Sequence, residues 1–152
     1  MSGHWKRFKV DESDESFLET RLVKFSVGRN GTRIELVCEN DIILQIIFEK
    51  WTLSYRITDK KCRLRTPTYL SEKYGKEVLG DYPFFIVEDS NYLKWFHHES
   101  SNIHENYGNH HVSHYVFVTS NYVIDILSSY PPEVKEIESD EKWMNQEEVN
   151  AK

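Results

Sequence analysis

The sequence predicts an α+β domain: an antiparallel β-meander of about four strands, one or two later strands, and two or three short helices packed on the sheet. Three observations predict this class. Apolar and polar residues alternate in the first half of the chain, Asn-Gly and Asn-Asp pairs separate the alternating runs, and later segments have helical spacing. The 152 residues are 39% hydrophobic and 14% aromatic, so the chain is able to bury the core of one domain.

The first half contains four candidate strands. RLVKFSV alternates as a half-buried strand does, and the following Asn30-Gly31 pair predicts a hairpin into RIELVCEN. IILQIIF is apolar almost throughout, which is typical of a central strand covered on both faces. WTLSYRIT alternates cleanly again. We therefore expect a consecutive antiparallel sheet built from the segments near 21–27, 33–38, 42–48 and 51–58.

The second half mixes helices and strands. YLSEKYGKEVLG predicts a short helix, although Gly75 interrupts it. FFIVE (84–88) and HYVFVT (114–119) are compact apolar runs that predict strands. Asp89 or Ser90 is a good N-cap for an amphipathic helix near 90–100.

A last helix is expected near 120–129. Ser120 is its candidate cap, and apolar residues follow at 123, 126, 127 and 130. The pair Pro131-Pro132 would end it, because proline cannot continue a helix.

Composition divides the chain into a polar N-terminal extension (1–20), one α+β domain (21–134) and an acidic C-terminal tail (135–152). The formal net charge is -6, which argues against nucleic acid or an anionic membrane as the main partner. No run approaches the roughly 18 apolar residues of a membrane span, and the first residues do not have the pattern of a signal peptide. These features predict a cytoplasmic protein with no membrane association.

The segment HHESSNIHENYGNHHVSH (97–114) holds six of the seven histidines. The zinc signature H-E-x-x-H fails there because position 102 is Asn. His110 and His114 are four residues apart, but the residues between them lead into a predicted strand. We therefore expect a polar loop and no metal or other cofactor, with His110 and His114 as the alternative metal ligands.

The two cysteines are far apart and form no C-x-x-C pair. Cys38 lies in an apolar strand, which predicts a buried free thiol. Cys62 lies between Lys61 and Arg63 in DKKCRLRTP, the most basic stretch of the chain, so it is the better candidate for a reactive thiolate. An ordinary thiol at that position remains the expectation, and no catalytic residue is predicted.

Three longer phrases carry a family resemblance: FEKWTLSYRITD, FFIVEDSNYLKWFHHES and HYVFVTSNYVIDILSSYPPEV. They resemble small Firmicutes proteins that are encoded near polymorphic toxins and regarded as immunity proteins. The resemblance covers roughly residues 42–134. It implies a non-catalytic cytoplasmic protein that binds a cognate toxin and occludes its active site, and the acidic balance fits a basic toxin domain.

Such a partner would contact an acidic and aromatic surface, in which carboxylates set register and aromatic side chains anchor the interface. The predicted anchors are aromatic residues left without an inward role, namely Tyr92, Tyr107 and Trp143. Their predicted acidic neighbours are Glu99, Glu105, Asp140 and Glu141. Two alternatives remain open at this point. One is a small metal-dependent enzyme that uses the 97–114 histidines, and the other is a self-assembling phage accessory protein.

Overall fold

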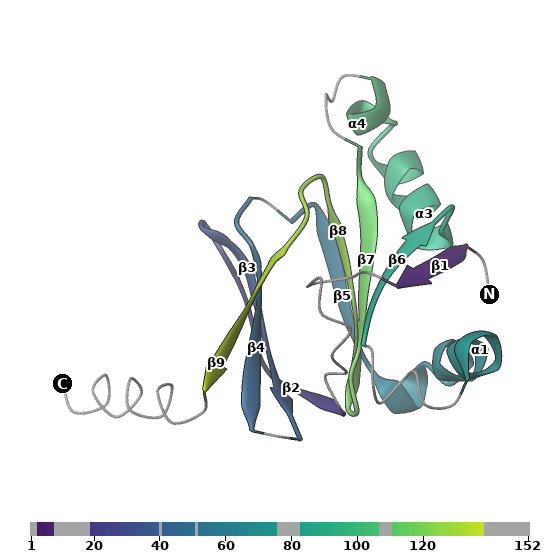
Figure 1. Ribbon diagram of the computed structural model, residues 1–152. Helices are drawn as coiled ribbons and strands as arrows, with labels where there is room; N and C mark the ends of the chain where they lie inside the picture. Colours follow the sequence, from purple (N-terminus) through teal and green to yellow (C-terminus); the bar gives the residue numbers. More distant parts are fainter. Residues whose placement is uncertain are drawn as a thin grey trace.

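Strand pairing divides the protein into two antiparallel sheets (Figure 1). The computed structural model describes residues 3–7, 19–39, 41–50, 52–75, 83–106 and 111–138. Sheet A has the order β1 (His4–Arg7), β6 (Phe84–Glu88), β7 (Ser113–Val118), β8 (Tyr122–Ser128) and β5 (Ser54–Asp59). Sheet B has the order β2 (Thr20–Gly28), β3 (Gly31–Cys38), β4 (Ile42–Phe48) and β9 (Glu133–Glu138). The predicted α+β class is confirmed.

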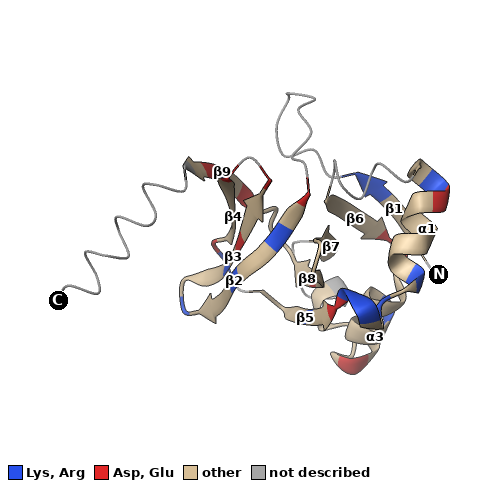
Figure 2. Ribbon diagram, turned by 90° about the horizontal axis from the view of Figure 1, so that it is seen from below, with Lys and Arg blue, Asp and Glu red and all other residues tan. Residues whose placement is uncertain are grey.

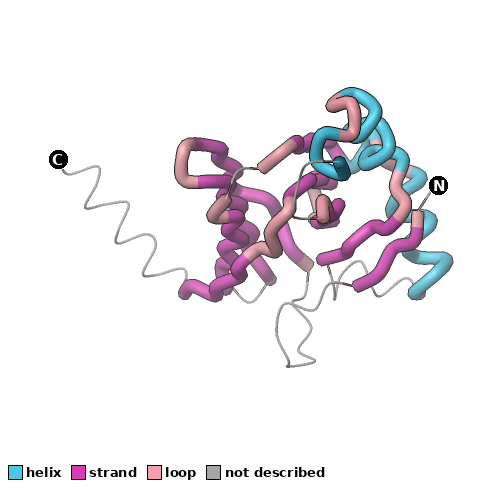
Figure 3. Tube along the Cα trace, turned by 90° about the horizontal axis from the view of Figure 1, so that it is seen from above, coloured by secondary structure: helices cyan, strands magenta, loops and turns pink. Residues whose placement is uncertain are grey.

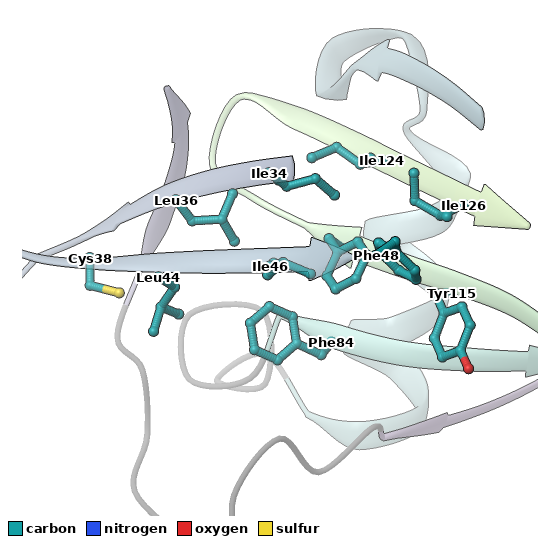
Figure 4. Packing of buried hydrophobic residues seen from close by; sticks show 11 residues of the cluster. Ile34, Leu36, Cys38, Leu44, Ile46, Phe48, Phe84, Tyr115, Ile124 and Ile126 are labelled. Atoms are coloured by element: carbon teal, nitrogen blue, oxygen red, sulfur yellow. The ribbon is translucent and has the colours of Figure 1, made fainter. Parts of the chain in front are cut away.

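The main core lies between the two sheets, as Figure 4 shows. Alternate residues of β3 and β4 point into it, and they meet the inward residues of β6, β7 and β8. Phe48 packs edge-on against Tyr115 and Phe117, with ring centroids 5.5 and 6.3 Å apart. The fully buried members include Ile34, Leu36, Leu44, Ile46, Phe84, Ile124 and Ile126.

The helices cover the other face of sheet A, on the side away from sheet B (Figures 1 and 3). They are the short helix η1 (Lys60–Cys62), then α1 (Arg65–Tyr74), α3 (Asn91–Glu99) and α4 (Ile103–Asn106). Leu70 of α1 packs with Phe85 and Val116 of the sheet, whereas Phe96 of α3 packs with Leu127. Helix α1 and helix α3 therefore cover different parts of one sheet face. No described helix is long and apolar enough to cross a membrane.

Several predicted elements are confirmed. The first three strands form a consecutive antiparallel meander, and β4 lies inside its sheet between β3 and β9. The hairpin between β2 and β3 is present, with Gly31 at φ +102°. Helix α3 begins after Ser90, whose side chain accepts a hydrogen bond from the Leu93 N–H at 3.0 Å.

The helix predicted near 120–129 is wrong, because these residues form β8. Residues 123–128 are all buried, since one face of β8 meets the core between the sheets and the other lies under the helical layer. A strand buried on both faces lacks polar and apolar alternation. The spacing of the apolar residues in this segment therefore also fitted a helix.

The fourth predicted strand is also placed wrongly. The segment near 51–58 supplies β5, which pairs with β8 in sheet A instead of continuing sheet B. The second neighbour of β4 is β9, which the chain reaches after Pro131-Pro132. Strand β1 lies within the predicted N-terminal extension, and most of β9 lies within the predicted C-terminal tail. The paired strands therefore reach beyond residues 21–134.

The short helix predicted in 69–80 begins earlier in the structure. Helix α1 spans Arg65–Tyr74, and the backbone leaves the helix at Gly75, whose φ is +96°. Residues 76–80 lie outside the described part of the chain.

Candidate functional site

Strand register assembles a group of polar residues on the helix-covered face of sheet A. Across the sheet, Trp5 is paired with Val87 and Val87 with His114. In the next row of the same face, Asp125 lies opposite Arg56. Apart from these side chains, the face is largely apolar, so Asp125 and His114 need partners within the protein.

Asp125 is fully buried and is held by three basic side chains. Arg63 Nη1 lies 2.7 Å from Asp125 Oδ2, and Arg56 Nε lies 2.9 Å from the same oxygen. His114 Nε2 lies 2.7 Å from Asp125 Oδ1. Burial alone would raise the pKa of Asp125, but the hydrogen bonds from His114 and Arg56 and the charges of Arg63 and Arg56 outweigh it. The pKa of Asp125 therefore lies well below its ordinary value, and the carboxylate stays ionised.

A pocket of about 500 Å³ opens above this group, between the start of α1 and the start of α3. Its floor comes from the sheet and its walls come from the helix starts and the η1 segment. The lining residues are Trp5, Arg56, Lys61, Cys62, Arg63, Leu64, Arg65, Thr66, Val87, Ser90, Asn91, Tyr92 and His114. Figure 2 shows Lys and Arg residues in blue on the helical side of the protein, including α1.

The pocket is strongly basic although the whole chain carries a net charge of -6. Four lining side chains are cationic: Arg56, Lys61, Arg63 and Arg65. Asp125 beneath them supplies one negative charge, so these five groups carry a net charge of three positive units. Such a concentration of charge in a partly enclosed site favours an anionic ligand.

Tyr92 gives the pocket lining an aromatic side chain. The Arg56 guanidinium lies over the Tyr92 ring, 4.3 Å from its centroid, and Trp95 is stacked against Tyr92 with centroids 5.8 Å apart. Burial raises the pKa of Tyr92, and the Asp125 charge adds to this effect, against the hydrogen bond with Ser54 and the Arg56 charge. The phenol therefore stays protonated, and its stacking partner Trp95 is 51% exposed beside the pocket.

No protein-family model, no curated protein and no solved structure matches this chain. Its functional assignment therefore depends on the geometry of the pocket and on the resemblance described above.

Of the predicted contact residues, the structure describes the side chains of Tyr92 and Glu99, which lie at opposite ends of α3. Tyr92 lines the pocket, but Glu99 is exposed at the last residue of α3, at the opposite end of that helix. Glu105 belongs to α4, but its side chain is not among those that the structure describes. The remaining predicted contacts also lie outside the described residues: Tyr107, Asp140, Glu141 and Trp143.

Of the two alternative metal ligands, the structure describes His114. His114 is buried on β7 and is bonded to Asp125, while His110 lies outside the described residues. Within the described ranges, no group of three or more His, Cys, Asp and Glu side chains is arranged to hold a metal ion.

The two cysteines have the predicted environments. Cys38 is buried in the core, and burial, with a smaller contribution from the Glu136 charge, raises its pKa to about 11. Cys62 is exposed and lines the basic pocket.

The central residue of the site, Asp125, was not predicted from the sequence. Asp125 stands alone as a charge in the apolar run YVIDIL, and a buried charge requires an opposite charge nearby. The basic stretch DKKCRLRTP supplies Arg63, but the pairing was hidden because the segment around Asp125 was expected to be a helix. The ion pairs of Asp125 become visible only from the strand register, which sets Asp125 opposite Arg56.

Proposed function

We propose that the protein is a non-catalytic binding protein that occludes a partner, and that an anionic group of the partner enters the basic pocket. The observation that carries this proposal is the excess of positive charge in a pocket of a net acidic chain. The floor groups already bind one another: Asp125 is fixed by two arginines, and His114 Nε2 is engaged with the same carboxylate. The more accessible groups, Lys61 and Arg65, are suited to electrostatic recognition.

Exposed apolar side chains beside the pocket support a protein as the partner. Leu64 lines the pocket and is 71% exposed, and Trp95 is 51% exposed on the first turns of α3. Tryptophan is among the residues that most often anchor protein interfaces, and the exposed leucine adds apolar area near it. An acidic partner group in the pocket and apolar contacts at its edge would together give charge recognition and buried area.

The resemblance to immunity proteins supplies the biological form of this proposal, in which the partner is a toxin encoded next to this gene. The proposal keeps the occluding function that the resemblance implies, but it places the contact surface at the basic pocket. The acidic residues named from the sequence, such as Glu99, are replaced by the basic pocket as the main contact.

Growth rescue tests the proposal. The toxin encoded by a neighbouring gene is co-expressed with the protein, either unchanged or carrying Lys61→Glu with Arg65→Glu. We expect the unchanged protein to restore growth and the double reversal to abolish rescue, because an anionic partner group would then meet two carboxylates. These side chains are exposed, so circular dichroism should show an intact fold.

The matched control is Arg29→Glu with Lys50→Glu, two exposed cations in the loops of sheet B. This variant should rescue as well as the unchanged protein. Equal loss with both pairs would overturn the role of the pocket. Loss on reversal of Glu99 and Glu105 instead would return the contact to the acidic surface, and a protein that rescues from no neighbouring toxin would remove the occluding function.

A further inference from the structure

We propose that the anionic group recognised by the pocket is a phosphate monoester. This inference rests on the proposed function, because it names the chemistry of the group that enters the same pocket. The first argument is the net positive charge of the pocket. Three positive charges remain above Asp125, whereas a carboxylate brings one negative charge and a phosphate monoester brings between about 1.5 and 2 at neutral pH.

Donor geometry gives the second argument. Each guanidinium has five N–H donors in a planar fork. Arg63 uses Nη1 for Asp125 and Nε for the Thr66 hydroxyl, 3.3 Å away, and these bonds leave further N–H groups on the same guanidinium. Asp125 thus fixes the orientation of Arg63 without using all of its donors. A prearranged arginine fork is the usual recognition element for phosphate oxygens.

Two buried ring nitrogens add donors or acceptors at the pocket floor. Among the residues that the structure describes, neither Trp5 Nε1 nor His114 Nδ1 has a hydrogen-bond partner. Both residues line the pocket and are only 3% and 2% exposed. A buried polar atom without a partner is costly, so a ligand oxygen that accepted a hydrogen bond from Trp5 Nε1 would be stabilised. His114 Nδ1 is an acceptor when Nε2 carries the proton, so it suits a P–OH group of a singly ionised monoester. Indole N–H is a donor only, which again favours an oxyanion.

The start of helix α3 points to the same ligand. Ser90, Asn91 and Tyr92 line the pocket, and Ser90 is the N-cap of this nine-residue helix. The first N–H groups of a helix, together with its dipole, attract anions and phosphates above all. Cations on the α1 side and a helix start on the α3 side would contact a tetrahedral phosphate from two directions, which a planar carboxylate uses less well.

The pocket volume of about 500 Å³ exceeds that of a bare phosphate and lies in the usual range for small-ligand sites. The esterified group therefore has room beside Leu64 and Tyr92. Two sources carry this chemistry, a free phosphorylated small molecule and a phosphorylated side chain of the partner protein. Both present the same monoester to the arginines.

Calorimetric titration of the full chain tests the inference. Phenyl phosphate and benzoate are compared as probes that share a ring and differ in the anion. We expect phenyl phosphate to bind roughly tenfold more tightly than benzoate, the ratio given by one additional charge-assisted hydrogen bond. Titrations with AMP and with a phosphoserine peptide then separate the two sources, and tight binding of either one supports the monoester.

The variant Lys61→Gln with Arg65→Gln should weaken phenyl phosphate binding roughly tenfold, since two charges are lost from the wall. The control Arg29→Gln with Lys50→Gln should bind it unchanged. A second readout is Cys62, which lines the pocket: bound phenyl phosphate should slow its reaction with a thiol reagent.

Benzoate binding as tightly as phenyl phosphate would overturn the inference, as would an equal affinity of the pocket variant and the control. These results are separable from a failure of the proposed function. If growth rescue depends on Lys61 and Arg65 while no phosphate probe binds, the partner offers a different anion. If phenyl phosphate binds but the pocket variant still rescues, the pocket is a phosphate site without a role in occlusion.

Discussion

At the scale of single residues, Asp125 determines the character of the pocket. This buried carboxylate fixes Arg56, Arg63 and His114 of the pocket lining through bonds of 2.7–2.9 Å. Without it, the two arginines would repel each other and lose their fixed orientation. A buried acid therefore prepares the site for an anion instead of opposing one.

We expect Asp125→Asn to lower the free energy of unfolding by about 2–4 kcal/mol. The substitution leaves Arg63, whose side chain is 18% exposed, without its charged partner. The loss should be smaller than for a fully buried pair, because Arg56 is 44% exposed and solvent screens it. Urea unfolding measures the difference, and a variant as stable as the wild type would show that the cluster contributes no stability.

The same pair of proteins gives a pH test with a definite sign. The folded-state pKa of Asp125 lies below its ordinary value of 3.8, so its contribution to stability is present above about pH 4 and is lost as pH falls further. The stability difference between wild type and Asp125→Asn should therefore shrink between pH 7 and pH 3. A difference that stays constant over this range would contradict the lowered pKa.

The cysteines differ in reactivity for reasons of position. Cys62 is exposed, whereas Cys38 is buried and its pKa is raised to about 11, chiefly by burial. We expect the folded protein to have one fast-reacting thiol, which Cys62→Ser removes and Cys38→Ser retains. Titration with a chromogenic disulfide reagent counts the thiols before and after unfolding. Fast reaction of Cys38 in the folded state would show that the core opens readily.

At the scale of elements, the hairpin between β2 and β3 depends on one glycine. Gly31 has φ +102°, and a Cβ at this position would overlap the carbonyl oxygen of Phe48. Gly28, across the same turn, has no atom within 4 Å of its own Cβ position.

We therefore expect Gly31→Ala to destabilise the protein by more than about 2 kcal/mol, because backbone strain and overlap act together. Gly28→Ala is the matched control and should change stability by less than about 0.5 kcal/mol. Thermal unfolding of both variants compares them. Equal melting temperatures would mean that the turn adapts to a side chain without cost.

The predictability of each element follows from how its faces are used. Strands β2 and β5 carry polar residues among their apolar ones, and the alternation in their segments marked both as strands. Strand β8 is buried on both faces, so its sequence contains no alternation and was interpreted as a helix. The sheet to which β5 belongs depends on pairing with β8, a segment far along the chain. Local pattern identified strands but not their distant partners.

The pocket was predictable only in part for the same reason. DKKCRLRTP showed a local excess of positive charge, and Ser90, the N-cap of α3, was one of the two candidate caps. Tyr92 was named as a contact residue and does line the pocket. The grouping of Asp125, His114 and Arg56 arises from three strands, so no local pattern in the sequence contains it.

At the scale of the whole molecule, a small polar connection joins the two sheets beside the apolar core. Asn121, just before β8 of sheet A, accepts from the Leu22 N–H at 3.0 Å and donates to the Leu22 carbonyl at 3.1 Å. Ser120 N–H donates to the Thr20 carbonyl at 2.7 Å in the same place. One side chain thus replaces a strand neighbour for β2, and it couples the edge of sheet B to sheet A.

We expect Asn121→Ala to cost about 1–3 kcal/mol, since two backbone groups of Leu22 lose their partner. The loss of stability in Asn121→Asp should be smaller than in Asn121→Ala, because the aspartate still accepts from the Leu22 N–H but cannot donate to the Leu22 carbonyl. Amide hydrogen exchange locates the effect. If the shared core makes the two sheets one cooperative unit, the slowest amides of β3 and β7 should lose protection equally in Asn121→Ala. Faster exchange confined to sheet B would show that this sheet opens by itself, and that Asn121 holds the sheets together where the core does not.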